Sequence, residues 1–196
     1  MDIEKTSSLE PHSPRPTKKE GFWDLIKFAI LALVIVVPVR TFIAQPFIVS
    51  GSSMFPTFHN SDYLIVDELS YRVGEPKRGD VVVFKWPKDT TKYFIKRIIG
   101  LPGETVKITG SKITIKNKDN PDGFVLDEPY VKNISENTSE IVLPDDQYFV
   151  MGDNRSGSSD SRAWGNLPRN LMVGRAFIRL FPLNDIGVLP GEFRNY

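Results

Sequence analysis

A hydroxyl-rich stretch near the start of the chain is the first candidate for chemistry. The sequence VSGSSMFPTF, residues 49–58, places three serines around one glycine and continues into a proline, a composition typical of a loop. A serine hydroxyl is a weak nucleophile at its own pKa, so a neighbouring base must take its proton before it attacks a carbonyl carbon. The chain must therefore supply such a base elsewhere.

Histidine, the usual base, is scarce. The two histidines are His12, in a proline- and serine-rich segment, and His59, in the turn-like sequence HNSD. A Ser/His/Asp triad would have to depend on His59 alone. Cysteine is absent, which excludes disulfides, thiol chemistry and cysteine-bound zinc. Two separate histidines make no metal site, although a site of carboxylates alone stays open. We expect neither a metal nor another cofactor.

A lysine can act as the base if burial keeps it neutral, because desolvation disfavours the ammonium form. In YFIKRIIG, residues 93–100, strand alternation places Lys96 on one face together with Phe94 and Ile98. Two large apolar neighbours are the surroundings that lower the pKa of a lysine. The plainer alternative is that Lys96 is a charge on an edge strand, where it protects against aggregation.

Composition divides the chain into three parts. Residues 1–20 carry many charges, three prolines and two isolated aliphatic residues, which predicts a disordered tail. Residues 21–44 are mainly apolar, and residues 45–196 are long enough for one domain with its own core. The 25 basic and 24 acidic residues give a net charge of +1, so nothing indicates nucleic-acid binding.

The apolar segment has three interpretations. It contains an uncharged run from Phe28 to Val39, but a helix that crosses a bilayer needs about 20 residues. A transmembrane anchor therefore requires the longer stretch 25–44, with Lys27 and Arg40 extending toward the two interfaces. The segment could instead belong to a cleaved signal peptide, although Phe42-Ile43-Ala44 lacks the small-x-small pattern, or form a buried helix of a soluble protein. We favour the anchor.

The charges that precede the apolar segment predict its orientation. Arg15, Lys18 and Lys19 cluster there, and basic residues stay on the cytoplasmic side of a membrane. We therefore expect a single-pass protein of the cell membrane, with residues 1–20 in the cytoplasm and residues 45–196 outside it.

Beyond the apolar segment the pattern is that of strands. Short β-branched and aromatic runs alternate with turns that contain Gly, Pro or Asp, and no helical pattern of similar length follows. The stretch VKITGSKITIK, residues 106–116, is the clearest hairpin. We predict a mostly β domain that is barrel-like, so that its strand edges are covered. The strand-like runs are residues 63–66, 81–84, 93–99, 106–109, 113–116, 141–143, 148–151 and 176–181.

Four stretches follow the apolar segment in a fixed order: GSSMFPTF, RGDVVVF, YFIKRIIGLPGE and MGDNRSGSSDSRAWG. Together they resemble the successive sequence boxes of bacterial type I signal peptidase, a membrane-bound endopeptidase with a Ser/Lys dyad. The resemblance covers the chain from the apolar segment to about Gly165. It implies the β-rich catalytic core of that family.

The resemblance implies a role for each matching residue. Ser53, just before a methionine, matches the nucleophile, and Lys96, first of a Lys-Arg pair, matches the general base. In the last box, Ser158 matches the hydroxyl that orients the lysine. Asp160 and Arg162 match a pair that supports the site structurally.

The loop before the nucleophile is expected to bind the oxyanion of the reaction. Gly51 and Ser52 belong to it, and the backbone N–H of Ser53 is the first expected donor. Some family members carry a serine at the position of Gly51, so the second donor is not identified. The last box has Ser156-Gly157 where the family commonly has Asp-Asn. These positions lie in a loop, and we expect the change to be tolerated.

The function that the resemblance implies is removal of N-terminal signal peptides from exported preproteins at the outer face of the membrane. Cleavage would follow a small-x-small pattern, usually Ala-x-Ala, by a monomer that contacts preproteins and the lipid bilayer. Two other classes stay open. A self-cleaving Ser/Lys repressor would need a DNA-binding segment, and a membrane-tethered β module that only binds exported proteins would not need Ser53 and Lys96 together.

Overall fold

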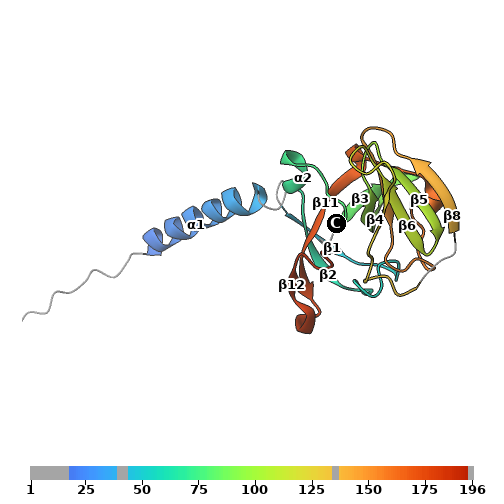
Figure 1. The fold of residues 1–196 in the computed structure, drawn as a ribbon. Helices are drawn as coiled ribbons and strands as arrows, with labels where there is room; N and C mark the ends of the chain where they lie inside the picture. The colour runs from blue at the N-terminus through green and yellow to red at the C-terminus, as the bar shows by residue number, and fades with distance from the viewer. Residues whose placement is uncertain (1–17, 39–43, 134–136, 194–196) are drawn as a thin grey trace, which may run out of the picture. The chain divides into compact units, whose positions relative to one another are not determined.

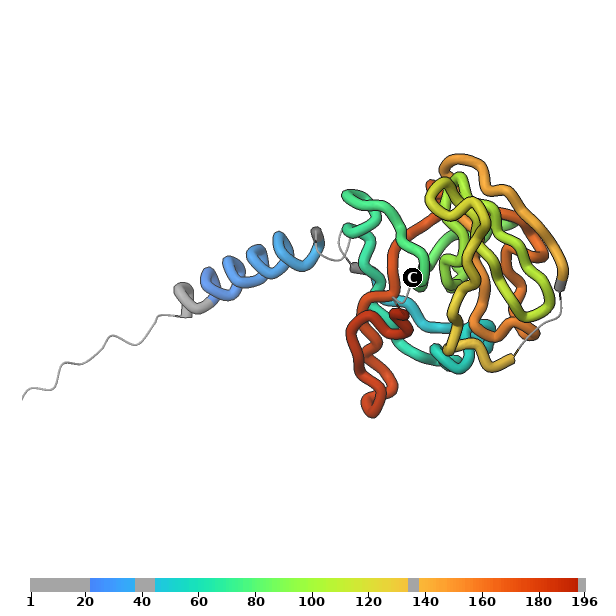
Figure 2. Tube along the Cα trace, viewed as in Figure 1, coloured from blue at the N-terminus to red at the C-terminus, as the bar shows by residue number. Residues whose placement is uncertain are grey.

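The computed structural model describes residues 18–38, 44–133 and 137–193 and divides the chain into two units, Met1–Val39 and Arg40–Tyr196. Helix α1 (Lys18–Pro38) belongs to the first unit and is 21 residues long. Figures 1 and 2 show the helix, largely in blue. Large apolar side chains between Phe22 and Val37 are exposed on it.

The bounds of α1 differ from those expected for the apolar segment. The helix begins at Lys18, inside the predicted tail, because the sequence Lys-Lys-Glu consists of good helix formers. It ends at Pro38, and Ala44, which the anchor prediction included, is the first residue of a strand. Residues 1–17 of the predicted tail lie outside the described residues. Within the described parts of the chain, no helix is both long enough and apolar enough for a membrane crossing.

The second unit is built on two antiparallel sheets (Figure 1). The larger sheet has the order β1-β2-β11-β3-β4-β9-β10, with β12 beside β11. Its strands are β1 (Ala44–Ile48), β2 (Tyr63–Asp67), β3 (Val81–Trp86), β4 (Asp89–Gly100), β9 (Gln147–Met151), β10 (Leu167–Pro168), β11 (Met172–Phe181) and β12 (Gly187–Val188). The smaller sheet has the order β7-β6-β5-β8, formed by β5 (Thr105–Gly110), β6 (Lys112–Lys116), β7 (Phe124–Val125) and β8 (Asn137–Val142).

Helical elements of the second unit are short. Among the described residues they are α2 (Ser70–Val73), α3 (Ser161–Trp164) and the 3₁₀ turns η2 (Arg169–Leu171) and η3 (Leu183–Asp185). The prediction of a mostly β domain is therefore confirmed. The predicted hairpin is also confirmed, since β5 and β6 pair in antiparallel register with Val106 opposite Ile115. Gly110 has a φ of 59° at its turn, a conformation that glycine adopts without a steric penalty.

The predicted barrel-like closure is wrong for the strands that the structure describes. The larger sheet is open, with β1 at one end of its path and β10 at the other. Closure was expected as a means of covering strand edges. The end strand β10 is instead only two residues long and is not exposed, and the free edge of β1 borders a cleft that is described below.

Three clusters of buried side chains hold the second unit together, and two of them position the candidate site. One lies under the loop 49–58 and contains Met54, Phe58 and Leu64. The second cluster contains Phe84 and Ile98 and lies on one face of β3 and β4. The third joins the smaller sheet to β9 through Val106, Ile108, Ile113, Ile115, Phe149 and Met151. Alternation of apolar residues along each strand produces these clusters.

Candidate active site

The structure brings together the two residues expected to perform the chemistry. Ser53 lies in the loop that follows β1, and Lys96 lies on β4, 43 residues further along the chain. Lys96 Nζ is 2.7 Å from Ser53 Oγ, and it also donates a hydrogen bond to the carbonyl oxygen of Ile95 at 2.8 Å. The hydroxyl and the amine are therefore close enough for direct proton transfer.

The surroundings of Lys96 are those that strand alternation predicts. Its partner across the sheet is Val82, and the side chain is 4% exposed. Nζ lies 5.3 Å from the ring centroid of Phe94 on the same strand. Burial lowers the pKa of Lys96 to about 8, while the negative charges of Asp160 and Asp153 act in the opposite direction. A substantial fraction of the amine is thus neutral in mildly alkaline solution.

The loop that carries Ser53 is fixed at several points. Gly51 has a φ of 91°, which favours glycine over serine at this position. Its N–H donates to Asn60 Oδ1 at 2.9 Å and is not free for a substrate. Met54, only 1% exposed, secures the far side of the loop in the core. Among the described residues, the N–H of Ser53 has no acceptor, so it is available to an oxyanion.

Asn154 is a residue of this site that the sequence analysis did not single out. Its backbone N–H donates to the carbonyl oxygen of Ser53 at 3.0 Å, and its Nδ2 donates to that of Ser52 at 3.1 Å. These bonds join the loop of the nucleophile to the loop that contains Ser158. Asn154 belongs to the motif MGDNR. The motif alone does not indicate that this asparagine forms hydrogen bonds to Ser52 and Ser53, far away in the sequence.

Gly152 and Ser158 lie directly against the nucleophile. A Cβ on Gly152 would overlap both Ser158 Oγ and the carbonyl oxygen of Ser53, so only glycine permits this approach. Ser158 Oγ is buried and has no hydrogen-bond partner among the described residues. Ser158 Oγ therefore makes no hydrogen bond to Lys96 Nζ, which donates to Ser53 Oγ and to the carbonyl oxygen of Ile95 instead. The role of Ser158 in orienting the lysine stays a prediction.

Asp160 and Arg162 form the pair that the resemblance implied. Arg162 Nε and Nη2 each donate to a different carboxylate oxygen of Asp160 at 2.7 Å. Asp160 also accepts the N–H of Gly152 at 3.1 Å, and Arg162 Nη2 donates to the carbonyl oxygen of Arg155 at 2.7 Å. The pair therefore holds the backbone of the loop 152–162 in place behind the dyad.

A buried ion pair next to Lys96 was also missed from the sequence. Arg97 and Asp153 are both fully buried, with two parallel contacts of 2.8 and 2.6 Å. Asp153 accepts a further hydrogen bond from Thr57 Oγ1 at 2.5 Å, and Arg97 Nη1 donates to the carbonyl oxygens of Gly79 and Gly191 at 2.9 and 2.5 Å. The cluster thus ties β4 to the loop that carries the nucleophile.

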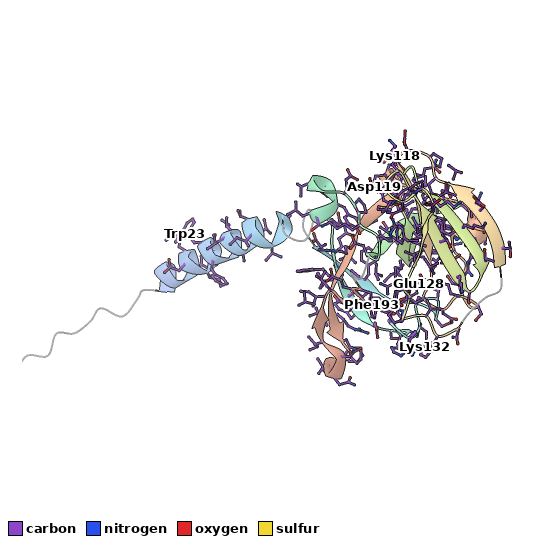
Figure 3. All side chains as sticks on the ribbon, viewed as in Figure 1. Trp23, Lys118, Asp119, Glu128, Lys132 and Phe193 are labelled. Carbon is purple, nitrogen blue, oxygen red and sulfur yellow. The ribbon has the colours of Figure 1, made fainter. Side chains whose placement is uncertain are left out.

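The C-terminal segment covers this cluster. The guanidinium carbon of Arg97 lies 3.9 Å from the ring centroid of Tyr130, which contacts the ring of Phe193 at 5.0 Å. Glu128 forms two contacts with Arg155, at 2.5 and 2.9 Å. Glu128 and Phe193 are labelled in Figure 3. The rings of Tyr130 and Phe193 and the ion pair of Glu128 therefore shield the side of the site that contains Arg97 from water.

We predict that Asp153→Ala destabilises the fold strongly, because it leaves the guanidinium of Arg97 buried without its carboxylate. The expected loss in the free energy of unfolding is about 3–5 kcal/mol, measured by urea denaturation. The matched control is Glu140→Ala, which removes an exposed partner of Lys107 at 3.8 Å and should cost at most about 1 kcal/mol. Equal losses for the two variants would contradict a special role of the buried pair.

A cleft of about 430 Å³ opens beside the dyad. Strand β1 pairs only with β2, and residues 93–96 of β4 pair with β3 on one side only. Both free edges line the cleft, which leaves room for an extended polypeptide between them. Its lining residues include Phe47, Ile48, Val49, Ser50, Tyr93 and Ile95.

His59 is exposed and does not line this cleft. Its ring lies edge-on to Phe55, with 5.4 Å between the ring centroids. The geometry therefore gives no support to a triad based on histidine. In the described parts of the chain, no group of three or more His, Asp or Glu side chains is arranged to hold a metal ion.

Known proteins resemble this chain over most of its length. Residues 22–181 match the family model described as signal peptidase, peptidase S26. A probable signal peptidase I-2 of Synechocystis sp. is 38% identical over 97% of this chain and 86% of its own length. Signal peptidase I P of Bacillus subtilis subsp. natto is 38% identical over 86% of this chain and 94% of its own length. A crystal structure of a signal peptidase I from Enterococcus faecalis is 29% identical and covers 52% of this chain and 96% of its own, with a TM-score of 0.44. The match over most of the chain shows that this protein belongs to the signal peptidase family, peptidase S26, a family of serine endopeptidases.

Proposed function

We propose that Ser53 and Lys96 form the catalytic dyad with which this enzyme removes N-terminal signal peptides from exported preproteins. The distance of 2.7 Å between Lys96 Nζ and Ser53 Oγ carries the proposal. The lowered pKa of the buried amine supports it, because a base must be neutral at the working pH.

The reaction would follow the logic of a Ser/Lys variant of the catalytic triad. Neutral Lys96 accepts the proton of Ser53 Oγ while the oxygen attacks the carbonyl carbon of the scissile bond. The N–H of Ser53 donates to the oxyanion that forms. The ammonium of Lys96 then gives its proton to the leaving amine, and an acyl-enzyme remains. Lys96 next takes a proton from water, which attacks the ester and releases the signal peptide with a free carboxylate.

The substrate would bind in an extended conformation between the free edges of β1 and β4. Backbone hydrogen bonds to a strand edge provide affinity that does not depend on sequence, and side-chain pockets provide selectivity. We propose that the residues before the scissile bond follow a small-x-small pattern, usually Ala-x-Ala. The apolar lining by Phe47, Val49 and Ile95 is compatible with small apolar side chains.

Incubation of the detergent-solubilised full chain with a labelled preprotein tests the proposed activity. A product of mature size, with a new N-terminus directly after the small-x-small pattern, is expected. A membrane-tethered module that only binds exported proteins would retain the preprotein intact, and that result would exclude the proposed activity. The enzyme is proposed to act as a monomer without a cofactor.

We further propose that the apolar segment predicted at residues 21–44, of which α1 forms the part as far as Pro38, anchors the protein in the cell membrane, with the residues before it in the cytoplasm and the residues after it outside. Exposed apolar side chains along α1 and the uncharged run from Phe28 to Val39 support this arrangement. Lipid would cover side chains that water solvates poorly. The short stretch of sequence between the proposed anchor and Ser53 limits how far the dyad could lie from the outer membrane surface, where signal peptides end.

Protease protection tests the orientation. Protease added to intact spheroplasts should digest the unit after Ala44 and spare the first 20 residues, because only the former is outside the membrane. Epitope tags at the two termini report each part, and lysed spheroplasts serve as the control in which both tags disappear. Protection of the C-terminal tag in intact spheroplasts would invert the proposed orientation.

A further inference from the structure

A second cleft lies next to the one that contains the dyad, since the two share a lining residue. It has a volume of about 610 Å³, and Tyr93 of β4 lines both clefts. On the facing strand β1, Phe47 lines the first cleft and Gln45, two residues earlier and hence on the same face, lines the second. The rings of Phe47 and Tyr93 lie 5.4 Å apart and mark the junction of the two clefts.

The two clefts differ in chemistry. Among the described residues that line the first cleft, Lys92 and Lys96 are the charged ones, and most of the others are apolar. The second cleft is lined by six charged side chains: Glu68, Arg72, Glu75, Lys85, Asp146 and Arg169. A polypeptide that passes from one cleft into the other therefore leaves apolar walls and meets charged ones.

Most of these charges are already paired. Arg72 contacts Glu68 at 3.3 Å, and Arg169 contacts Glu75 at 3.8 Å. The backbone N–H of Arg169 donates to the backbone carbonyl oxygen of Asp146 at 2.9 Å, but the exposed carboxylate of Asp146 forms no ion pair with any described residue. Lys85 is exposed and forms no ion pair with any described residue.

Lys85 also has the position from which it can meet a substrate. It lies on β3 directly opposite Tyr93, so its side chain stands beside the junction of the clefts. From Lys96 to Tyr93 the strand covers three residues, about 10 Å at roughly 3.3 Å per residue. An extended substrate with its scissile carbonyl at Ser53 passes the junction after about three residues.

We infer that the second cleft binds the substrate segment that lies four to six residues before the scissile bond, and that Lys85 favours acidic side chains there. The direction in which the substrate chain runs through the two clefts rests on the proposed function, in which the small-x-small residues before the scissile bond occupy the first cleft. A cation at the entrance attracts a carboxylate and repels an ammonium group, so it acts as a specificity residue without touching the reacting atoms.

Two matched peptides test the inference with the full chain in detergent. They share one Ala-x-Ala site and differ only in Glu or Lys at the fifth position before the scissile bond. The wild type should cleave the Glu peptide with a roughly three- to tenfold higher kcat/KM, mainly through a lower KM, because the interaction is between exposed charges. The preference should largely vanish at about 1 M salt, where the screening length is about 3 Å.

Charge reversal identifies the residue. Lys85→Glu should invert the order of the two peptides, whereas Lys112→Glu, an exposed lysine on β6 of the other sheet, should leave the wild-type order. An unchanged ratio in Lys85→Glu overturns the inference. A second peptide pair carries Glu or Lys at the third position after the scissile bond. If Lys85→Glu changes the preference within this pair and not within the first, the proposed direction of the substrate chain is overturned. Failure of every enzyme to cleave any peptide would contradict the proposed function rather than the inference.

Discussion

Ser53→Ala and Lys96→Ala should each lower kcat/KM for a preprotein or an Ala-x-Ala peptide by at least about 10⁴-fold. The first variant removes the nucleophile, and the second removes the amine that lies 2.7 Å from it. Because the two groups act as one unit, the double variant should be no less active than either single variant. The measurement is steady-state cleavage with purified full-length protein.

A folded state must be demonstrated for these variants. Removal of the buried amine leaves the carbonyl oxygen of Ile95 without that donor, so circular dichroism and urea denaturation should accompany each assay. Ser111→Ala provides a control, because it deletes an exposed hydroxyl in the turn between β5 and β6, in the other sheet. More than a trace of activity in Ser53→Ala, or a loss in Ser111→Ala of the same size, would disprove the assignment of the nucleophile.

The pH dependence of kcat/KM should show an ascending limb with its midpoint near pH 8. Only the neutral form of Lys96 accepts a proton from Ser53, and burial lowers the pKa of this amine to about 8. Acid converts the base to its ammonium form, and activity falls as the pH decreases. Near pH 6, two units below the midpoint, kcat/KM should be about a hundredfold lower than on the plateau.

The control for this profile is His59→Ala. His59 is exposed and outside the cleft of the dyad, so its removal should leave the midpoint unchanged. A limb near about pH 6.5, the usual range of histidine, that disappears in His59→Ala would show that histidine is the base. Profiles from about pH 5 to 11 with a short peptide substrate distinguish the two outcomes.

The position of Lys96 could be predicted because a strand has a simple period. Phe94 and Ile98 flank the lysine at a spacing of two residues, and the structure places all three on one face of β4. Arg97 follows the same alternation onto the other face, but its complete burial depends on Asp153, 56 residues away. Long-range partners of this kind leave no local pattern in a single sequence.

The bounds of elements and the closure of the sheet were harder to predict for a similar reason. Whether β1 pairs on one edge or on both depends on which strands lie beside it in space, and the sequence pattern of β1 is the same in both cases. The roles of Asn154 and Gly152 likewise come from contacts with the loop of Ser53, 101 and 99 residues earlier in the chain. The residue types around Gly152 and Asn154 indicated a loop, but they did not indicate that this loop lies against the loop of Ser53.

The burial of Lys96 has a consequence for the folding stability of the enzyme. Its amine binds a proton less tightly in the folded protein, where the pKa is about 8, than in an unfolded chain, where it is 10.5. At 1.36 kcal/mol per unit of pKa, the difference lowers the free energy of unfolding by about 3 kcal/mol below pH 8. The loss diminishes between pH 8 and 10.5 and vanishes above that range, since neither state then holds the proton. A fall in pH from 10.5 to about 8 therefore weakens the fold through the same group whose charging stops catalysis.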